Sequence, residues 1–206
     1  FGSPPNYNPK PEDSIERMAK EKGVSAAELA YEILIENDGN NFIYAPLVNY
    51  ADHTFGVCKR MLDDKNAIMG LGDGGAHVGF ILDAGYPTWL ISYWSVKKKA
   101  FSMEETVRRL TSDTANAAGL NDRGLLKVGL KADINIIDWE NVGSSDPFMT
   151  QDLPAGGKRL MQHTQGYITT IVSGKVTYKN GEFTKERPGT IVKSVKDSEK
   201  TLEFTN

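Results

Sequence analysis

One carboxylate, Asp73, stands among glycines in a stretch whose residue types could support hydrolytic chemistry. The apolar run 67–71 has the length of one buried strand, and it ends abruptly at Gly72. Asp73 follows at once, and His77 comes four residues later. In a barrel of alternating strands and helices, the carboxyl ends of the strands hold side chains rigidly while the loops give access. A carboxylate there can bind a divalent metal ion and accept a proton from metal-bound water.

Two other interpretations of the same residues stay open. Aspartate is common in turns because its side chain bonds to the nearby backbone, so Asp73 could simply begin a turn with Gly74. Residues 70–75 also match the pattern G-x-G-x-x-G, which would make this stretch a nucleotide-binding module. That module needs a helix starting within the motif and an acidic residue about 20 residues further on. Glycines and a proline follow closely instead, and aromatic residues stand where the acid is needed, which argues against this alternative.

The other candidates for chemistry are isolated side chains. His77 could contact a substrate or be a structural histidine, whereas His53 and His163 have no ligand spacing and read as structural or surface residues. Cys58 is the only cysteine, so the chain has no internal disulfide and no cysteine-based zinc site. No histidine is paired with Cys58 in the sequence, and we expect a core or surface thiol.

Helical spacing predicts several helices in the first 120 residues. One begins after Pro11 and stops at Gly23. Capping boxes at Ser25–Glu28 and Ser102–Glu105 predict two more helix starts. The side chains expected to face inward are Ala27, Ala30, Ile33 and Leu34 in the first of these helices, and Val107 and Leu110 in the second.

Residues 42–72 read as a parallel crossover unit of strand, helix and strand. Its predicted parts are a strand at 42–45, a helix at 53–62 with Val57 and Met61 facing inward, and a strand at 67–71. Just beyond, a short helix starting at Thr88 is rich in large apolar groups, and its tryptophans are expected in the core.

The pattern changes after residue 120. Alternation over 132–138 predicts a strand, and 167–172 with 175–178 predicts a hairpin. Asn180-Gly181 is the strongest short hairpin signal. Residues 140–166 have no strong periodicity, and 153–157 read as loop. The sequence therefore predicts an α/β domain over residues 1–120 and a β-rich domain over residues 121–206.

Composition excludes several classes. The net charge of −3 and an isoelectric point near 5.7 argue against a nucleic-acid partner. No apolar run approaches the roughly 20 residues that span a bilayer, so no membrane partner is expected and a cytoplasmic protein is the default. The start at residues 1–5 is neither a signal peptide nor a natural beginning, and we expect a part of a longer protein.

Several motifs together resemble the N-acyl-D-amino-acid deacylases of the amidohydrolase superfamily. The loop at 70–79 is similar to the last metal-site loop of these enzymes, and the resemblance runs through the chain in order. The other matching segments are 106–115, 119–124, 128–134, 152–160 and 187–189.

The resemblance implies a fold, a metal and a reaction. The fold is the C-terminal portion of a metal-dependent (β/α)8 barrel followed by part of a small β-sandwich. Asp73 would be a zinc ligand and the catalytic base in hydrolysis of an N-acyl-D-amino acid, a small-molecule substrate. Gly74, Gly75 and His77 would lie at the substrate.

The family's other metal ligands are absent from the sequence. There is no His-x-His, and the region where the well-studied branch has a substrate-binding arginine reads Leu82-Asp83-Ala84-Gly85. We therefore expect a chain that holds one ligand of several and is inactive alone. The exposed strand edges and apolar faces of a partial barrel also predict self-association, and a non-catalytic assembly unit is a further alternative.

Overall fold

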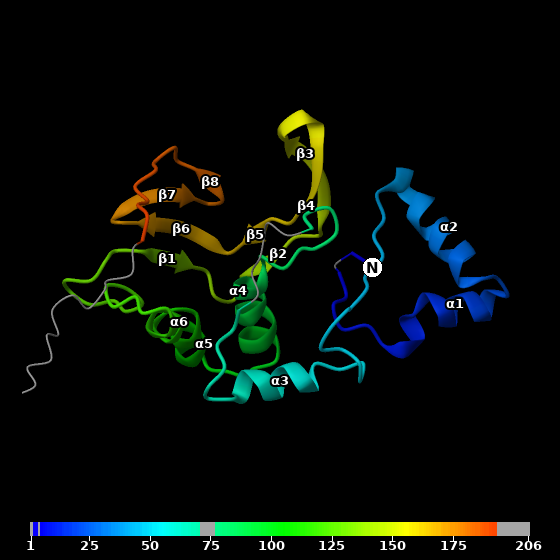
Figure 1. Cartoon of the computed structure of the whole chain (residues 1–206), viewed down its shortest axis with the longest axis horizontal. Coiled ribbons are helices and arrows are strands. Elements are labelled where there is room, and N and C mark those ends of the chain that lie inside the picture. Colours follow the sequence, from blue (N-terminus) through cyan, green and yellow to red (C-terminus); the bar gives the residue numbers. More distant parts are fainter. Residues whose placement is uncertain (1, 4, 71–76, 193–206) are drawn as a thin grey trace, which may run out of the picture. The chain divides into compact units, whose positions relative to one another are not determined.

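The computed structural model describes residues 2, 3, 5–70 and 77–192, and shows helices up to residue 117 and strands from residue 134 (Figure 1). The structure confirms a chain of mixed helices and strands, but the described residues before Ile134 contain helices and no strand, so the α/β pattern expected over residues 1–120 is not seen there. All sheets of the described residues lie between Ile134 and Phe183, and none of them closes into a barrel. Within the described ranges, no helix has the length and apolar character needed to span a bilayer.

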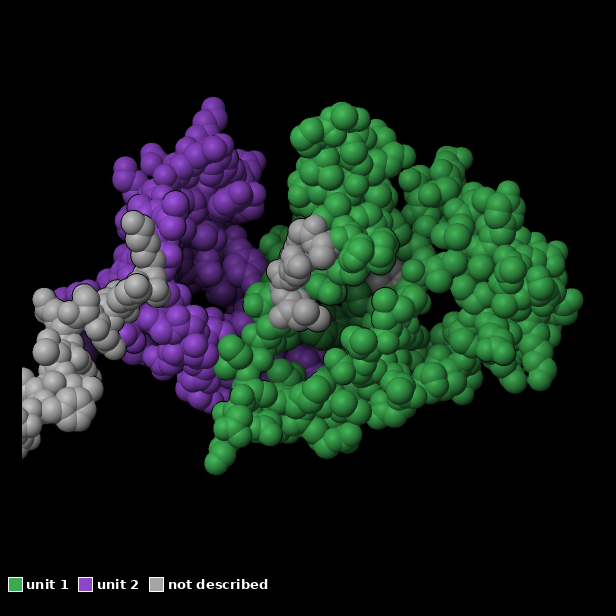
Figure 2. Space-filling model, in the orientation of Figure 1, with its two compact units in different colours: residues 1–89, 143–164 green, residues 90–142, 165–206 purple. Residues whose placement is uncertain are grey.

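The chain divides into two compact units, each made of two separate segments (Figure 2). Unit 1 contains residues 1–89 and 143–164, and unit 2 contains residues 90–142 and 165–206. Residues 90–142, which include the domain boundary expected near residue 120, lie within unit 2. The contacts that define the units do not test a domain boundary, so that boundary stays a prediction.

The first helices of unit 1 begin at capping residues, and α1 ends at a glycine in the left-handed conformation. A short 3-10 turn, η1 (Pro11–Asp13), precedes α1 (Ile15–Lys22), which ends at Gly23 with a φ of 71°. Ser25 caps α2 (Ala26–Gly39) by accepting a hydrogen bond from the Glu28 amide at 3.1 Å. Both predicted helix signals are confirmed, because capping depends only on neighbouring residues.

The predicted inner face of α2 is partly wrong. Leu29 is buried with a relative exposure of 1%, whereas Leu34 is 43% exposed and Ala27 is also exposed. The backbone leaves helical geometry at Glu36, so the last turn does not continue the stripe. Packing against α1 determines which side of α2 is buried. The spacing of apolar residues along α2 does not by itself identify that side.

The predicted crossover unit is not present in the described residues. Its helix exists as α3 (Gly56–Asp63), but neither 42–45 nor the described part of the second run, 67–70, is a strand. Short apolar runs do not distinguish strand from other structure, and a strand exists only within a ladder. The inward prediction also fails for Met61, which is 44% exposed.

A buried aromatic helix follows. The single turn α4 (Tyr86–Trp89) continues into a π-helix, η2 (Leu90–Lys97). Trp94 is buried, as expected for a core residue, and Trp89 is half-buried. This segment supplies the largest cluster of buried apolar side chains: Leu90, Ile91, Tyr93 and Trp94.

Two further helices complete the helical part. Ser102 caps α5 (Met103–Leu110) through the Glu105 amide at 3.1 Å, and α6 (Ser112–Ala117) ends before Gly119. The inward prediction for Val107 is wrong, since Val107 is 44% exposed and Thr106 is fully buried instead. Thr106 tolerates burial because its hydroxyl donates to the Ser102 carbonyl at 2.7 Å.

Unit 2 contains a four-stranded antiparallel sheet. Its order is β1-β6-β7-β8, with β1 at Ile134–Ile137, β6 at Tyr167–Val172, β7 at Lys175–Lys179 and β8 at Glu182–Phe183. The turns at Ser173-Gly174 and Asn180-Gly181 have positive φ at both residues, as two-residue hairpin turns require. Both predicted hairpins are confirmed. Whether this sheet belongs to the expected small sandwich stays a prediction.

The stretch without periodicity contains strands that the sequence did not reveal. β2 (Gly143–Ser144) pairs with β5 (Thr164–Gln165), and β3 (Phe148–Leu153) pairs with β4 (Gly157–Met161). The predicted loop at 153–157 is in part a 3-10 turn, η3 (Pro154–Gly156), at the tip of the β3–β4 hairpin.

Gly166 offers a test of this fold. An added Cβ would lie 2.6 Å from the Val142 Cα at a φ of +85°, and the Gly166 carbonyl accepts from the Asp138 amide at 2.7 Å. We expect Gly166→Ala to lower the free energy of unfolding by about 2–4 kcal/mol, from left-handed strain plus overpacking.

Gly174→Ala is the matched control, because its φ is +77° and no atom lies within 4 Å of an added Cβ. It should cost only about 1 kcal/mol. Urea unfolding midpoints measure both variants, and equal losses would contradict the close approach at Gly166.

Candidate functional site

Asp73, Gly74 and Gly75 lie outside the described residues, and their predicted roles stay predictions. The described chain resumes at His77, which begins a turn at a φ of 49°. The His77 carbonyl accepts two amide hydrogen bonds, from Phe80 at 2.9 Å and from Ile81 at 3.0 Å. The turn is thus closed by its own backbone.

The His77 side chain is exposed and its ring lies against the Phe80 ring, with centroids 5.2 Å apart. Histidine is among the few residues with a side chain that enter the left-handed region with some frequency. An exposed imidazole can reach a bound molecule, which is what a substrate contact needs. The prediction that His77 contacts substrate is compatible with this position and remains a prediction.

A distant strand holds this turn. The Leu160 amide in β4 donates to the Val78 carbonyl at 2.7 Å. Two residues further along, Gln162 donates from Nε2 to the Tyr7 hydroxyl at 3.1 Å and to the Ser145 carbonyl at 2.6 Å. The His77 turn, the N-terminal segment and the end of β4 are therefore joined within unit 1.

Aromatic rings pack beside these contacts. The Tyr7 ring meets the rings of Tyr44 and Trp89 edge to face, at centroid distances of 5.8 and 5.1 Å. Phe55 lies against Trp89 at 6.2 Å. Burial raises the pKa of Tyr7 and of Tyr44, so both phenols are neutral at neutral pH and act as hydrogen-bonding groups rather than bases.

The isolated histidines and the cysteine have the structural positions that their sequence context favours. His53 is exposed with its ring against Tyr50, and His163 is exposed with its ring against Phe148. Cys58 is half-buried in α3, and its thiol approaches the Asn49 carbonyl at 3.6 Å. Burial raises the pKa of the Cys58 thiol, which disfavours the reactive thiolate.

No metal centre is assembled by the described residues. Residues 2, 3, 5–70 and 77–192 contain no group of three or more His, Cys, Asp or Glu side chains arranged to hold a metal ion. A catalytic zinc site keeps at least three protein ligands, so the described part of the chain does not fit such a site by itself.

The nucleotide-binding alternative receives no support from the residues after the motif. The pattern at 70–75 requires a helix that starts within it. His77–Phe80 form a turn instead, and the next helix begins only at Tyr86.

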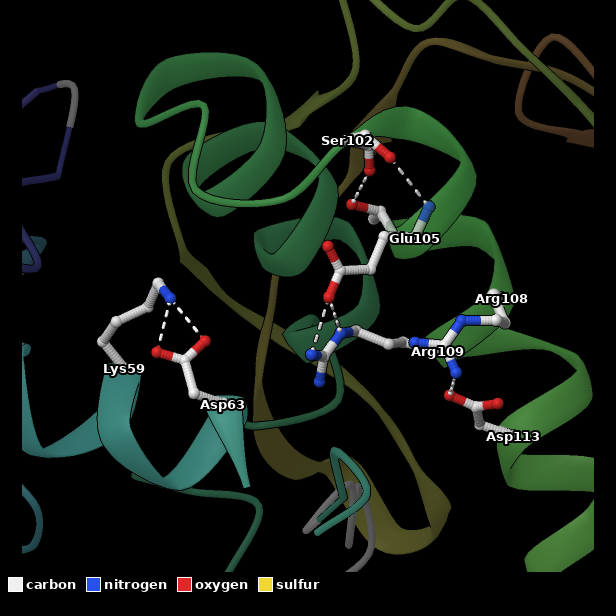
Figure 3. A network of polar contacts seen from close by, with 8 residues as sticks. Lys59, Asp63, Ser102, Glu105, Arg108, Arg109 and Asp113 are labelled. Carbon is white, nitrogen blue, oxygen red and sulfur yellow. Dashed lines mark hydrogen bonds and ion pairs between the residues drawn. The ribbon is translucent and has the colours of Figure 1, made fainter. Parts of the chain in front are cut away.

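Three charged side chains of α5, those of Glu105, Arg108 and Arg109, are engaged in structural pairs (Figure 3). Glu105 accepts from the Arg109 guanidinium at 2.8 Å, and Arg108 pairs with Asp113 at 2.6 Å. The Arg109 guanidinium also lies 4.5 Å from the centre of the Phe101 ring. These contacts stabilise the helix and its packing, and they point to no chemistry in residues 103–113.

Sequence reasoning missed Gln162 and the Asp152–Arg159 pair. Arg159 donates to both carboxylate oxygens of Asp152, at 2.7 and 2.6 Å, across the tip of the β3–β4 hairpin. Opposite charges on either side of a Pro-Ala-Gly turn could have indicated a hairpin there. Nothing in the sequence indicated Gln162, since its contacts are with residues 17 and 155 positions away.

Comparison with known proteins gives three findings. A sequence model of the amidohydrolase family matches residues 7–178. Dihydroorotases from Lactobacillus acidophilus and Lactobacillus johnsonii are each 33% identical to this chain over 89 residues, which is 41% of the chain and 20% of each relative. A crystal structure of D-aminoacylase, which defines a novel subset of amidohydrolases, shares 21% identity at a TM-score of 0.46, covering 84% of this chain and 32% of that one. The chain thus spans about a fifth of the length of the curated relatives.

The raised pKa of Cys58 gives a clean test, because the chain has one cysteine. Thiols react as thiolates, so the folded chain has less of the reactive form at pH 7.5 than a free thiol with a pKa of about 8.5. We expect modification by Ellman's reagent at pH 7.5 to be slower in the folded chain than in urea. The difference should shrink as pH rises through the raised pKa. Equal rates at pH 7.5 would contradict the burial of this thiol.

Proposed function

This chain belongs to the amidohydrolase family, and from that membership we propose that it forms part of a metal-dependent hydrolase acting on a non-peptide C–N bond. The observation that carries the proposal is the family match over residues 7–178. That range includes the glycine-rich loop with Asp73 and the segments at 106–115 and 128–134. Because the chain spans a small share of its relatives, the activity is proposed for the protein in which these residues act, not for the chain alone.

Asp73 has the central role in the proposal. It acts as a ligand of a zinc ion and as a proton acceptor, and the neighbouring Gly74 and Gly75 carry no side chains that would compete for the space. A carboxylate in reach of a nucleophilic water can take up a proton as the bond is attacked. The described residues contain no group of three or more His, Cys, Asp or Glu side chains that could hold a metal ion, and the proposal is that residues of the longer protein complete the site.

We propose an N-acyl-D-amino acid as the substrate, with His77 at the bound molecule. Support comes from the segment Asp152–Leu160, whose Asp-Leu-Pro-Ala-Gly-Gly motif resembles the deacylase branch. The exposed His77 imidazole fits a contact with a small polar substrate. The dihydroorotase similarity favours a second candidate, dihydroorotate, and assays with both compounds in parallel distinguish the two.

Asp73→Asn tests the proposal in the full-length enzyme. We expect kcat to fall by about 10²–10⁴-fold, since an amide cannot accept the proton that the carboxylate takes. Asp83→Asn is the matched control, because it makes the same chemical change ten residues away in the same stretch of chain and should leave kcat nearly unchanged. Retention of full activity by Asp73→Asn would overturn the assignment.

The chain alone gives a complementary test. With added zinc it should hydrolyse neither N-acyl amino acids nor dihydroorotate at a measurable rate, because one carboxylate does not make a catalytic zinc site. Turnover by this chain that Asp73→Asn abolishes would show that it holds a complete site.

A further inference from the structure

The β3–β4 hairpin is joined to the His77 turn although about 80 residues separate them. The joining bond runs from the Leu160 amide to the Val78 carbonyl at 2.7 Å. Because this N–H donates to Val78, it points away from β3, and Leu160 lies opposite Met149 on the other strand. β4 therefore uses one edge for its partner strand and the other for the turn.

The turn needs such support. His77 has a φ of 49°, and a left-handed residue with a side chain costs about 1–2 kcal/mol. Conformations of this kind persist where the surroundings impose them. Here two amides of the turn bond to the His77 carbonyl, and β4 fixes the next carbonyl, that of Val78.

Gln162 fixes the end of β4 to the segments around it. Both Nε2 protons are used, one by the Tyr7 hydroxyl at 3.1 Å and the other by the Ser145 carbonyl at 2.6 Å. Its Oε1 lies 3.5 Å from where a Cβ on Gly85 would stand. A single half-buried side chain thus bonds to the N-terminal segment and to the residue after β2, and it lies near the residue before α4.

The Asp152–Arg159 pair joins the two strands of the hairpin beside its tip, where the register shifts between Thr150 and Leu153. Two parallel N–H to oxygen bonds form a fork that is directional as well as charged. The hydrogen bonds from Arg159 hold the pKa of Asp152 below its usual range.

We propose that Gln162 is a positioning residue that acts through β4 on the His77 turn, so that the β3–β4 hairpin sets where the His77 imidazole lies. This inference rests on the proposed function for its catalytic meaning, because His77 is the proposed substrate contact. The coupling between hairpin and turn is a property of the chain itself and is measurable without activity.

The test is nuclear magnetic resonance of the 206-residue chain, with the His77 ring signals assigned through His77→Gln. Gln162→Leu keeps most of the side-chain volume and removes both donors. We expect it to shift the His77 ring signals and to speed amide exchange at Leu160 by about tenfold, the effect of losing roughly one net hydrogen bond. Gln162→Glu, which keeps the size and loses the amide donors, covers the case in which the leucine variant fails to fold.

Lys158→Ala is the control, because Lys158 is an exposed residue on the same strand. It should change neither the His77 ring signals nor the Leu160 exchange. Unchanged His77 signals in both folded Gln162 variants, or equal shifts in Lys158→Ala, would overturn the inference.

Activity separates this inference from the proposed function. In the full-length enzyme, Gln162→Leu should raise KM by about tenfold with a smaller change in kcat, since a displaced substrate contact weakens binding first. If Asp73→Asn abolishes turnover while the Gln162 variants leave the resonances unmoved, only the positioning role fails. If the resonances move and no hydrolysis is found, only the proposed reaction fails.

Discussion

The hydrogen bond from the Leu160 amide to the Val78 carbonyl is the contact that ties the His77 turn to a distant strand. It joins β4, in the β3–β4 hairpin, to the turn that follows the glycine-rich loop. Backbone groups removed from water need a partner, so a bond of this kind is favoured whatever side chains surround it. Among the described residues, the backbone of β4 thus gives the His77 turn a partner from a distant part of the chain.

Features that depend on neighbouring residues could be predicted from the sequence, and features that depend on distant partners could not. Ser25 and Ser102 cap helices, and Asn180-Gly181 turns a hairpin, because the groups involved are three residues apart or fewer. The runs at 42–45 and 67–71 read as strands, but 42–45 and the described part of the second run, 67–70, belong to no ladder in the described residues. A helix satisfies its own backbone, whereas a strand requires a neighbour that the pattern of one segment cannot reveal.

The burial of side chains also depends on distant partners, and it was predicted less well than the helix caps and turns. Helical spacing identified which helices would be amphipathic but placed Val107 inside, where Thr106 is buried, and overlooked Leu29. For the candidate site, the glycines around Asp73 distinguish the loop by residue type alone. Gln162 has no such mark, because its importance comes from Tyr7 and Ser145, which are brought to it only by the fold.

Between β1 and β6 of the four-stranded sheet, the chain inserts residues 138–166, an excursion that contains the β3–β4 hairpin. The chain leaves the sheet after Ile137 and re-enters it at Tyr167, and these two residues lie opposite each other in the β1–β6 pair. The Asp138 amide donates a hydrogen bond to the Gly166 carbonyl, so the first and last residues of the excursion lie side by side. Topologically it is an insertion into an antiparallel hairpin, which is the arrangement that tolerates exchange of the inserted segment. Swapping that segment between related proteins could therefore alter the surroundings of His77 while leaving the sheet intact.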